Sequence, residues 1–263
     1  MKNLIYILAP FILIVSCNPK ESIFTPAVFE KEFLVYGQGD TVLYNILIPH
    51  SPGKDEKVPL FLFLHGGGER GFDNEAQLVH IAPILVKDSI QKTFPAILVF
   101  PQCRSNDHWG QIQRVDGTIS AQYAEDPTPS MNGVMHLLDT LITRLPVDLN
   151  RIYLGGLSMG GFGTFDLLAR RPDWFAAAVP ICGGADTSMV SLFKDVPIRI
   201  YHGDADPVVP VSLSRDAYQA LVNQGATSVE YFELQGVDHD AWNPAFQDST
   251  LLHWIFSQKK TGK

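Results

Sequence analysis

Three short segments, far apart in this chain, carry residue types that could act together in nucleophilic catalysis. The first reads Gly156-Leu157-Ser158-Met159-Gly160, the second contains Asp206 and the third contains His239. A serine hydroxyl is a weak nucleophile at neutral pH, so it needs a histidine to take its proton and a carboxylate to orient that histidine. Serine, aspartate and histidine follow one another here in an order known for such triads. We therefore predict that these three side chains form a catalytic triad.

The residues around Ser158 indicate a sharp turn from a buried strand into a helix. An apolar run at 151–154 precedes the motif, and apolar residues at helical spacing follow it at 162–170. Such a turn strains the serine backbone and leaves no room for neighbouring side chains, which accounts for the flanking glycines. This is the context that a nucleophile elbow requires. The alternative is a glycine-rich turn without chemistry.

Other aspartates compete for the role of the triad carboxylate. Asp204 lies close to Asp206, but Pro207 and the apolar run after it shape a rigid turn, which favours Asp206. Two more aspartates flank His239 directly and are badly placed to reach its Nδ1, so we expect them to be solvated loop charges. These flanking residues are Asp238 and Asp240.

Hydrolysis of an acyl group also needs hydrogen-bond donors for the oxyanion. One donor should be the backbone N–H of Met159, the residue after the nucleophile. The second should come from the loop after the apolar run at 60–64, where small residues let N–H groups approach closely. We favour Gly67 for this role, with Gly66 and Gly68 as alternatives.

Short apolar runs recur along the chain and predict the strands of one sheet. The inner runs are continuously apolar, which is typical of strands buried on both faces, and helical patterns separate most of them. The sequence therefore predicts an α/β fold with a mostly parallel, twisted sheet of about eight strands and helices on both faces. The predicted strands lie at 32–36, 42–48, 60–64, 96–100, 151–154, 175–181, 197–201 and 229–234.

Helices are predicted between and after these strands. Pro83 should kink or bound the first of them, and Ser130 is a plausible N-cap of the second. The segment 102–129 shows no regular pattern, and long irregular loops in compact domains are usually functional or mobile. The predicted helices lie at 74–87, 131–144, 162–170, 211–223 and 250–258.

The N-terminal residues are predicted to be a targeting segment rather than part of the fold. Lys2 precedes an apolar run at 4–15, which is too short to span a bilayer comfortably. The run ends in Ile14-Val15-Ser16-Cys17, which resembles a bacterial lipobox. This implies a signal peptide at 1–16, a lipid on Cys17 and a tether at 17–25 before one domain at 26–260; the alternative is an ordinary signal peptide with an incidental cysteine. We thus expect an exported lipoprotein, periplasmic or outer-membrane-anchored, that meets the membrane by its lipid anchor only.

Composition and spacing exclude several other classes of protein. The net charge is −8 and no basic cluster with interleaved aromatic residues is present, which argues against nucleic-acid binding. We predict no metal, because the histidines do not recur at ligand spacing, and no nucleotide cofactor, because the glycine fingerprint is missing. His65 and His202 are expected to be structural. Cys103 and Cys182 could form a disulfide, but two separate thiols are favoured.

With these residues in place, the chain resembles the α/β-hydrolases. It is most similar to exported bacterial esterases related to feruloyl and acetylxylan esterases, to polyhydroxybutyrate depolymerases and to dienelactone hydrolases. Asp238 departs from the glycine that such proteins often have before the catalytic histidine. The segments that carry the resemblance are Leu64-His65-Gly66-Gly67-Gly68-Glu69-Arg70-Gly71, Phe100-Pro101-Gln102-Cys103, Gly156-Leu157-Ser158-Met159-Gly160-Gly161, Pro180-Ile181-Cys182-Gly183-Gly184, His202-Gly203-Asp204-Ala205-Asp206-Pro207 and Val237-Asp238-His239-Asp240-Ala241-Trp242.

The resemblance implies hydrolysis of carboxylic esters through an acyl-enzyme on a small-molecule or oligosaccharide ester. Trp109 and Trp242 could flank the entrance and stack on a sugar or a phenolic acyl group, although ordinary packing is the alternative. Two other functions stay open at this point: a serine peptidase of the same fold, and a non-catalytic, lipid-anchored glycan-binding protein.

Overall fold

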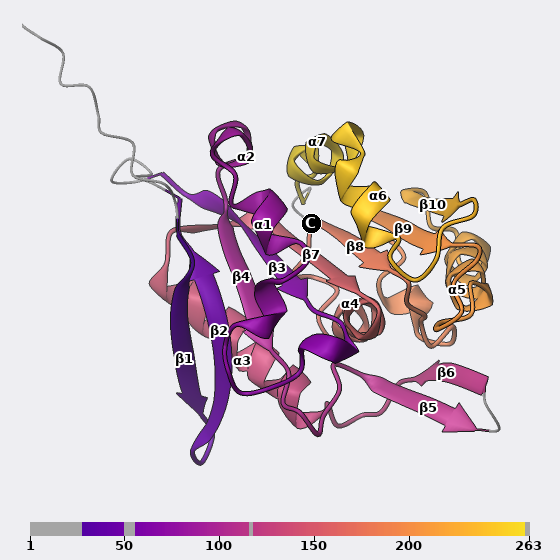
Figure 1. Ribbon diagram of the computed structural model, residues 1–263, viewed down its shortest axis with the longest axis horizontal. Coiled ribbons are helices and arrows are strands. Elements are labelled where there is room, and N and C mark those ends of the chain that lie inside the picture. Colours follow the sequence, from indigo (N-terminus) through magenta and orange to yellow (C-terminus); the bar gives the residue numbers. More distant parts are fainter. Residues whose placement is uncertain (1–27, 50–55, 116–117, 261–263) are drawn as a thin grey trace, which may run out of the picture.

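The computed structural model describes residues 28–49, 56–115 and 118–260 (Figure 1). The predicted signal peptide, Cys17 and the tether at 17–25 lie outside the described residues. None of the described helices is long and apolar enough to cross a bilayer.

Eight strands form the central sheet in the order β1-β2-β4-β3-β7-β8-β9-β10. β1 pairs with β2 and β2 with β4 in antiparallel fashion, whereas all later neighbours are parallel. The predicted mostly parallel sheet is therefore confirmed. The strands are β1 (Glu30–Tyr36), β2 (Asp40–Leu47), β3 (Val58–Leu64), β4 (Ile97–Gln102), β7 (Val147–Leu157), β8 (Ala177–Ile181), β9 (Ile198–Gly203) and β10 (Val229–Leu234).

The alternation of side chains along the inner strands explains why both faces of the sheet are covered. Every residue of β3 is buried. Leu62 and Leu64 point into the core cluster on one face, while Phe61 and Phe63 point into the cluster on the other. An apolar strand of this kind can be stable only between two layers of helices.

The helices form those two layers, as predicted. α3, α4 and α5 contribute side chains to the first cluster, whereas α1, α2, α6 and α7 pack against the second (Figure 1). The helices are α1 (Ala82–Leu85), α2 (Asp88–Thr93), α3 (Pro129–Arg144), α4 (Met159–Arg170), α5 (Ser212–Asn223), α6 (Trp242–Gln247) and α7 (Ser249–Ser257), with short 3-10 turns η1 (Gly67–Glu69), η2 (Ala76–Leu78) and η3 (Val190–Leu192).

The single helix predicted at 74–87 is wrong, because this segment folds into separate short turns. Asn74 adopts a left-handed backbone with φ 53°, and its side chain donates to the carbonyl oxygens of Glu32 and Tyr44. Pro83 then lies in the first turn of α1, where its missing N–H is tolerated. The contacts of Asn74 with β1 and β2 thus replace the regular helical start.

The irregular segment at 102–129 contains a hairpin that the sequence reading missed. β5 (Gln111–Val115) pairs antiparallel with β6 (Thr118–Gln122) outside the main sheet, and the hairpin projects beside α4 and α5 (Figure 1). The N-cap of α3 is also different from the prediction. The Thr128 hydroxyl accepts the N–H of Met131, and Ser130 lies inside the first turn.

Candidate active site

Ser158 occupies the turn between β7 and α4 in a strained backbone conformation, with φ 53° and ψ −118°. Its N–H donates to the carbonyl oxygen of Ile181 at 2.8 Å, which ties the turn to β8. A Cβ on Gly160 would lie 2.0 Å from the backbone oxygen of Leu64, and one on Gly156 would lie 2.2 Å from that of Gly160. Both distances are far below van der Waals contact, so the strand and helix can approach this closely only with glycine. The structure therefore has the expected elbow geometry.

The three predicted side chains meet at the carboxyl ends of β7, β9 and β10. The Ser158 hydroxyl lies 2.8 Å from Nε2 of His239, and Nδ1 of the same ring lies 2.7 Å from Oδ2 of Asp206. The competing carboxylate, Asp204, instead accepts the N–H of Gly236. The geometry thus singles out Asp206 from the two candidates.

Hydrogen bonds keep the Asp206 carboxylate ionised in spite of its burial. Its side chain is 0% exposed, and burial alone would raise its pKa. His239 and the backbone N–H groups of Val208 and Val209 outweigh that effect and hold the pKa of Asp206 below its ordinary value. An ionised carboxylate can fix the imidazole tautomer and stabilise the imidazolium that forms when serine loses its proton.

A second histidine contacts the same carboxylate, and the sequence reading treated it only as structural. Nε2 of His202 lies 3.2 Å from Oδ2 of Asp206 and 3.0 Å from the carbonyl oxygen of Val209. Both neighbours are acceptors, so Nε2 must carry a proton. Burial lowers the pKa of His202, although Val209 and Asp206 oppose that effect. No sequence signal pointed to this contact, because a spacing of four residues brings side chains together on helices, whereas His202 lies in β9.

The two cysteines of the described chain are separate, as favoured, and both are buried. Cys182 places its sulfur near Asp206 and His202, with potential ligand atoms of the three residues within 4.8 Å of one another. Burial and the charge of Asp206 raise the pKa of the Cys182 thiol to about 12. A protonated thiol is a poor metal ligand, and the Asp206 carboxylate already accepts from two imidazoles. The group is therefore better suited to hydrogen bonding than to metal binding.

The glycine loop after β3, defined as residues 66–68, lies directly beside the nucleophile. A Cβ on Gly66 would sit 3.6 Å from Cβ of Ser158. Gly67 and Gly68 line the same pocket as Ser158. Met159 begins α4, and the first N–H groups of a helix lack intrahelical partners. The predicted oxyanion donors thus lie around the serine, with all three glycines still candidates for the second donor.

A buried histidine anchors this glycine loop. The backbone N–H of Cys103 donates to Nε2 of His65 at 2.9 Å, so Nδ1 carries the proton and donates to the Gly66 oxygen at 2.6 Å. Burial lowers the pKa of His65 to about 4, which keeps the ring neutral. The neutral ring therefore joins the loop after β3 to the end of β4.

A pocket of about 530 Å³ opens above Ser158 and His239. One wall is apolar and includes two residues of the hairpin that the sequence reading missed. Arg70 and His108, which were not predicted as site residues, lie on the polar side. The lining residues are Gly67, Gly68, Arg70, His108, Ile112, Ile119, Ser158, Met159, Phe162, Val208, Val209 and His239.

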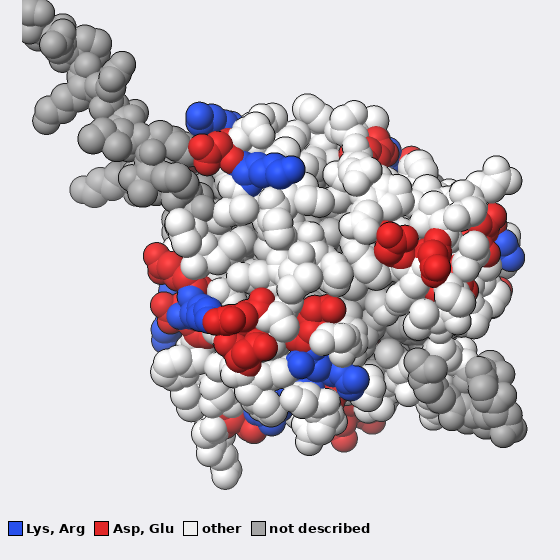
Figure 2. All heavy atoms as spheres, in the orientation of Figure 1, with Lys and Arg blue, Asp and Glu red and all other residues white. Residues whose placement is uncertain are grey.

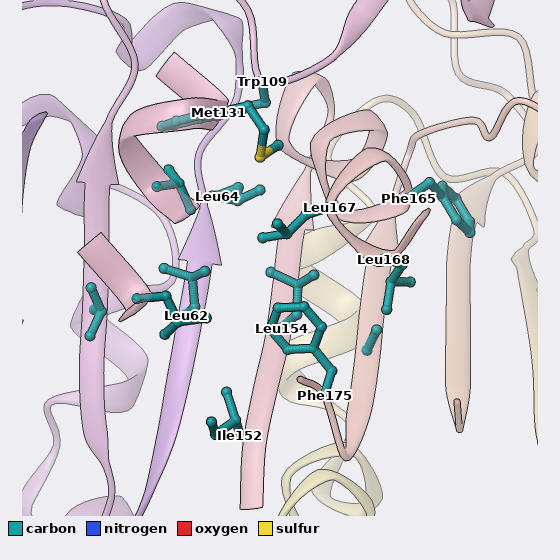
Figure 3. Close-up of a cluster of buried hydrophobic side chains, with 14 of the residues drawn as sticks. Leu62, Leu64, Trp109, Met131, Ile152, Leu154, Phe165, Leu167, Leu168 and Phe175 are labelled. Carbon is teal, nitrogen blue, oxygen red and sulfur yellow. The ribbon is translucent and has the colours of Figure 1, made fainter. Parts of the chain in front are cut away.

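The prediction that Trp109 stacks on substrate is wrong. The residue is 0% exposed and lies in the core beside Leu64 and Met131 (Figure 3). Its indole N–H donates to the carbonyl oxygen of His65, and a Cβ on Gly163 would lie 2.3 Å from its Cβ. The loop that carries Trp109 therefore packs against α4 at Gly163, and the indole supports the segment after β3 from the core side.

Trp242 is also not part of the pocket lining. It is 8% exposed, and its ring packs edge-on against the ring of His239 with centroids 5.5 Å apart. His80 contacts the same indole at a centroid distance of 5.1 Å. Trp242 therefore supports the imidazole of His239, and no substrate contact is assigned to it.

Comparisons with known proteins agree with this geometry. The sequence model of the family described as Phospholipase/Carboxylesterase matches residues 50–252. A poly(3-hydroxyalkanoate) depolymerase C of Paucimonas lemoignei is 26% identical over 222 residues, which cover 73% of this chain and 49% of that protein. The chain thus spans about half the length of this curated relative.

Solved structures show the same fold. A thermostable esterase is 33% identical with a TM-score of 0.79, and the match covers 88% of this chain and 63% of that one. A ferulic acid esterase from Anaeromyces mucronatus, solved in complex with ferulic acid, has a TM-score of 0.61 at 15% identity and covers 91% of this chain and 93% of that one. At this low identity the second likeness shows the fold alone.

Proposed function

This chain belongs to the phospholipase/carboxylesterase family, and from that premise we propose that it hydrolyses carboxylic esters through an acyl-enzyme on Ser158. One observation carries the proposal. The Ser158 hydroxyl, the His239 ring and the Asp206 carboxylate form a continuous hydrogen-bonded series, and two of the three line the pocket. Such a series supplies an activated nucleophile together with its general base.

The geometry accounts for each step of the reaction. Nε2 of His239 takes the Ser158 proton while Oγ forms a bond to the ester carbonyl carbon, and the N–H of Met159 and one glycine-loop N–H bind the oxyanion. His239 then protonates the leaving alcohol as the carbon–oxygen bond breaks. Water attacks the acyl-enzyme in the same way, with His239 as base, and Ser158 regains its proton when the acid leaves.

The shape of the pocket supports esters with an aromatic or other apolar acyl group. Ile112, Ile119 and Phe162 provide an apolar wall above the nucleophile. A flat phenolic acyl group would bury apolar surface against that wall. We therefore propose phenolic esters as substrates; ferulic acid, which is bound in the A. mucronatus enzyme, is a phenolic acid of this kind.

The chemistry is tested with p-nitrophenyl esters and the purified chain lacking residues 1–17. Ser158→Ala should abolish turnover and labelling by a fluorophosphonate probe. Ser257→Ala serves as the matched control, because that hydroxyl is exposed, donates to the Trp254 oxygen, accepts from Nε2 of Gln258 and does not line the pocket. Full activity in the Ser158 variant would show that the mechanism is wrong.

Export and lipid anchoring remain part of the proposal, supported by the sequence at 1–17 alone. Cells that express the full chain should incorporate a labelled fatty acid into it, and Cys17→Ser should remove the label and release the protein from the membrane fraction. Unchanged labelling of the variant would contradict the lipobox assignment.

A further inference from the structure

The pocket above Ser158 carries one cationic group that the proposed mechanism does not use. Arg70 lines this pocket together with the nucleophile. Its Nε donates to the carbonyl oxygen of Gly67 at 2.9 Å, and its Nη1 donates to that of Asp107 at 3.3 Å. A guanidinium has five N–H donors, so these two bonds leave donors over. The carbonyl contacts fix the side chain in place without neutralising its charge.

The nearby carboxylates are engaged elsewhere. Asp107 accepts the backbone N–H groups of His108 and Ser130 with its two oxygens. Glu69 directs Oε1 toward His80 at 3.4 Å, while its Oε2 is buried 4.0 Å from Nδ1 of His65 and has no hydrogen-bond partner in the described part of the chain. Among the described residues, no carboxylate forms an ion pair with Arg70, whereas the buried Arg170 is paired with Asp166 at 2.7 Å. Arg70 therefore presents an unbalanced positive charge inside the pocket.

The net charge of the chain gives no general attraction for anions. The chain has a net charge of −8, and on the face shown in Figure 2 the basic side chains occur in small groups beside acidic ones. We expect a preference for an anionic substrate to come from this local guanidinium, whose planar donors match a carboxylate. Since long-range steering is weak, the preference should appear in binding once the substrate is in the pocket.

We propose that the pocket selects esters that carry a carboxylate within reach of Arg70, and that the apolar wall of Ile112, Ile119 and Phe162 binds the remainder of the same substrate. The inference rests on the proposed ester hydrolysis and adds a substrate class to it. Arg70 is then a substrate-binding residue that determines specificity. The carboxylate can belong to the acyl group or to the leaving alcohol, and the two arms of the experiment separate these cases.

The test compares two matched pairs of esters. For the acyl side, p-nitrophenyl hydrogen adipate is compared with p-nitrophenyl hexanoate. For the alcohol side, p-acetoxybenzoate is compared with p-acetoxybenzamide. The measured quantity is the ratio of kcat/KM for the charged ester to that for the neutral ester, after subtraction of uncatalysed hydrolysis.

Wild-type enzyme should prefer the charged ester in at least one pair. Because a hydrogen bond to a charged group is worth about one to two powers of ten in affinity, Arg70→Gln should lower that ratio by about ten- to hundredfold, mainly through KM. Arg70→Lys should keep part of the preference. The matched control is Arg215→Gln, since Arg215 is exposed on α5, pairs with Glu233 and does not line the pocket. It should leave the ratio unchanged.

Two results would overturn the inference. The first is an equal ratio in wild type and Arg70→Gln; if activity toward both esters falls by the same factor, the side chain only supports the glycine loop. The second is a wild-type preference for the neutral ester in both pairs. Absence of turnover with all four esters would refute the proposed function as well, whereas turnover without a carboxylate preference would refute this inference alone.

Discussion

Acidification should destabilise this protein through His65, and the structure gives both the sign and the size of the effect. The ring is 2% exposed, and its Nε2 accepts the N–H of Cys103, so a second proton would face a donor in a dry site. Burial lowers the pKa from 6.5 to about 4. Between these values the unfolded chain binds a proton that the folded chain does not, so stability falls as the pH falls through this window.

The shift of two to three pKa units corresponds to about 3 kcal/mol of unfolding free energy at 1.36 kcal/mol per unit. For a domain of this size such a loss lowers Tm by about 6 to 12 °C. The full contribution is present above pH 6.5 and is lost by about pH 4. The measurement is thermal unfolding of wild type and His65→Gln across that range at constant ionic strength.

Other groups titrate in the same range, so the informative quantity is the difference in slope between wild type and variant. His65→Gln can keep an acceptor for Cys103, whereas His65→Asn can keep a donor toward Gly66. The two variants should differ in absolute stability but share the same flatter dependence on pH, because neither side chain titrates. Curves that run parallel to the wild-type curve would refute the assignment of a neutral, proton-excluding His65.

Two further substitutions test the elbow and the triad. Gly160→Ala gains about 1 kcal/mol of helix propensity but places a Cβ 2.0 Å from the backbone oxygen of Leu64, so we expect a large net drop in Tm. Gly68→Ala is the control, because no neighbouring atom among the described residues lies within 4 Å of the added Cβ, and it should leave Tm unchanged. Equal Tm values for the two variants would contradict the packing argument. Asp206→Asn should lower kcat by about 10⁴-fold with an intact circular dichroism spectrum, because the amide no longer fixes the required His239 tautomer. A decrease in kcat of less than about tenfold in Asp206→Asn would contradict the proposed role of Asp206.

The parts of the fold that could be predicted from sequence are those that follow from local pattern. The run at 60–64 is continuously apolar, and only burial on both faces of a sheet accommodates such a strand. The elbow was equally readable from its Gly-x-Ser-x-Gly spacing between a buried strand and a helix. A Cβ on Gly156 would meet the nearby backbone of Gly160, whereas one on Gly160 would meet the backbone of Leu64, far away in the sequence. The motif itself therefore predicted the turn, although the sequence did not show which segment packs against Gly160.

The errors concern residues whose environment is set by distant segments. Trp109 lies in a polar, irregular stretch and looked available to substrate, but the absence of a side chain at Gly163 lets it pass under α4. The hairpin at 111–122 has few of the apolar residues that mark strands, and among its described side chains Ile112 and Ile119 line the pocket. Arg70 gave no signal, since its importance depends on where Asp107 and Glu69 direct their carboxylates.

The polar groups buried beneath the site explain how loops can hold reacting atoms in fixed positions. His65 joins the glycine loop to Cys103, and the Trp109 indole joins the next loop to the His65 carbonyl. His202 joins the Asp206 turn to Val209 and also approaches Ser214 on α5 with Nδ1 at 2.7 Å. Each of these rings is buried, so breaking one contact would leave an unsatisfied polar group in a dry environment. We therefore expect the loops of the site to open only when the carboxyl ends of the strands beneath them unfold. The buried contacts with the core, rather than the loop sequences alone, then fix the positions of the oxyanion donors and of Asp206.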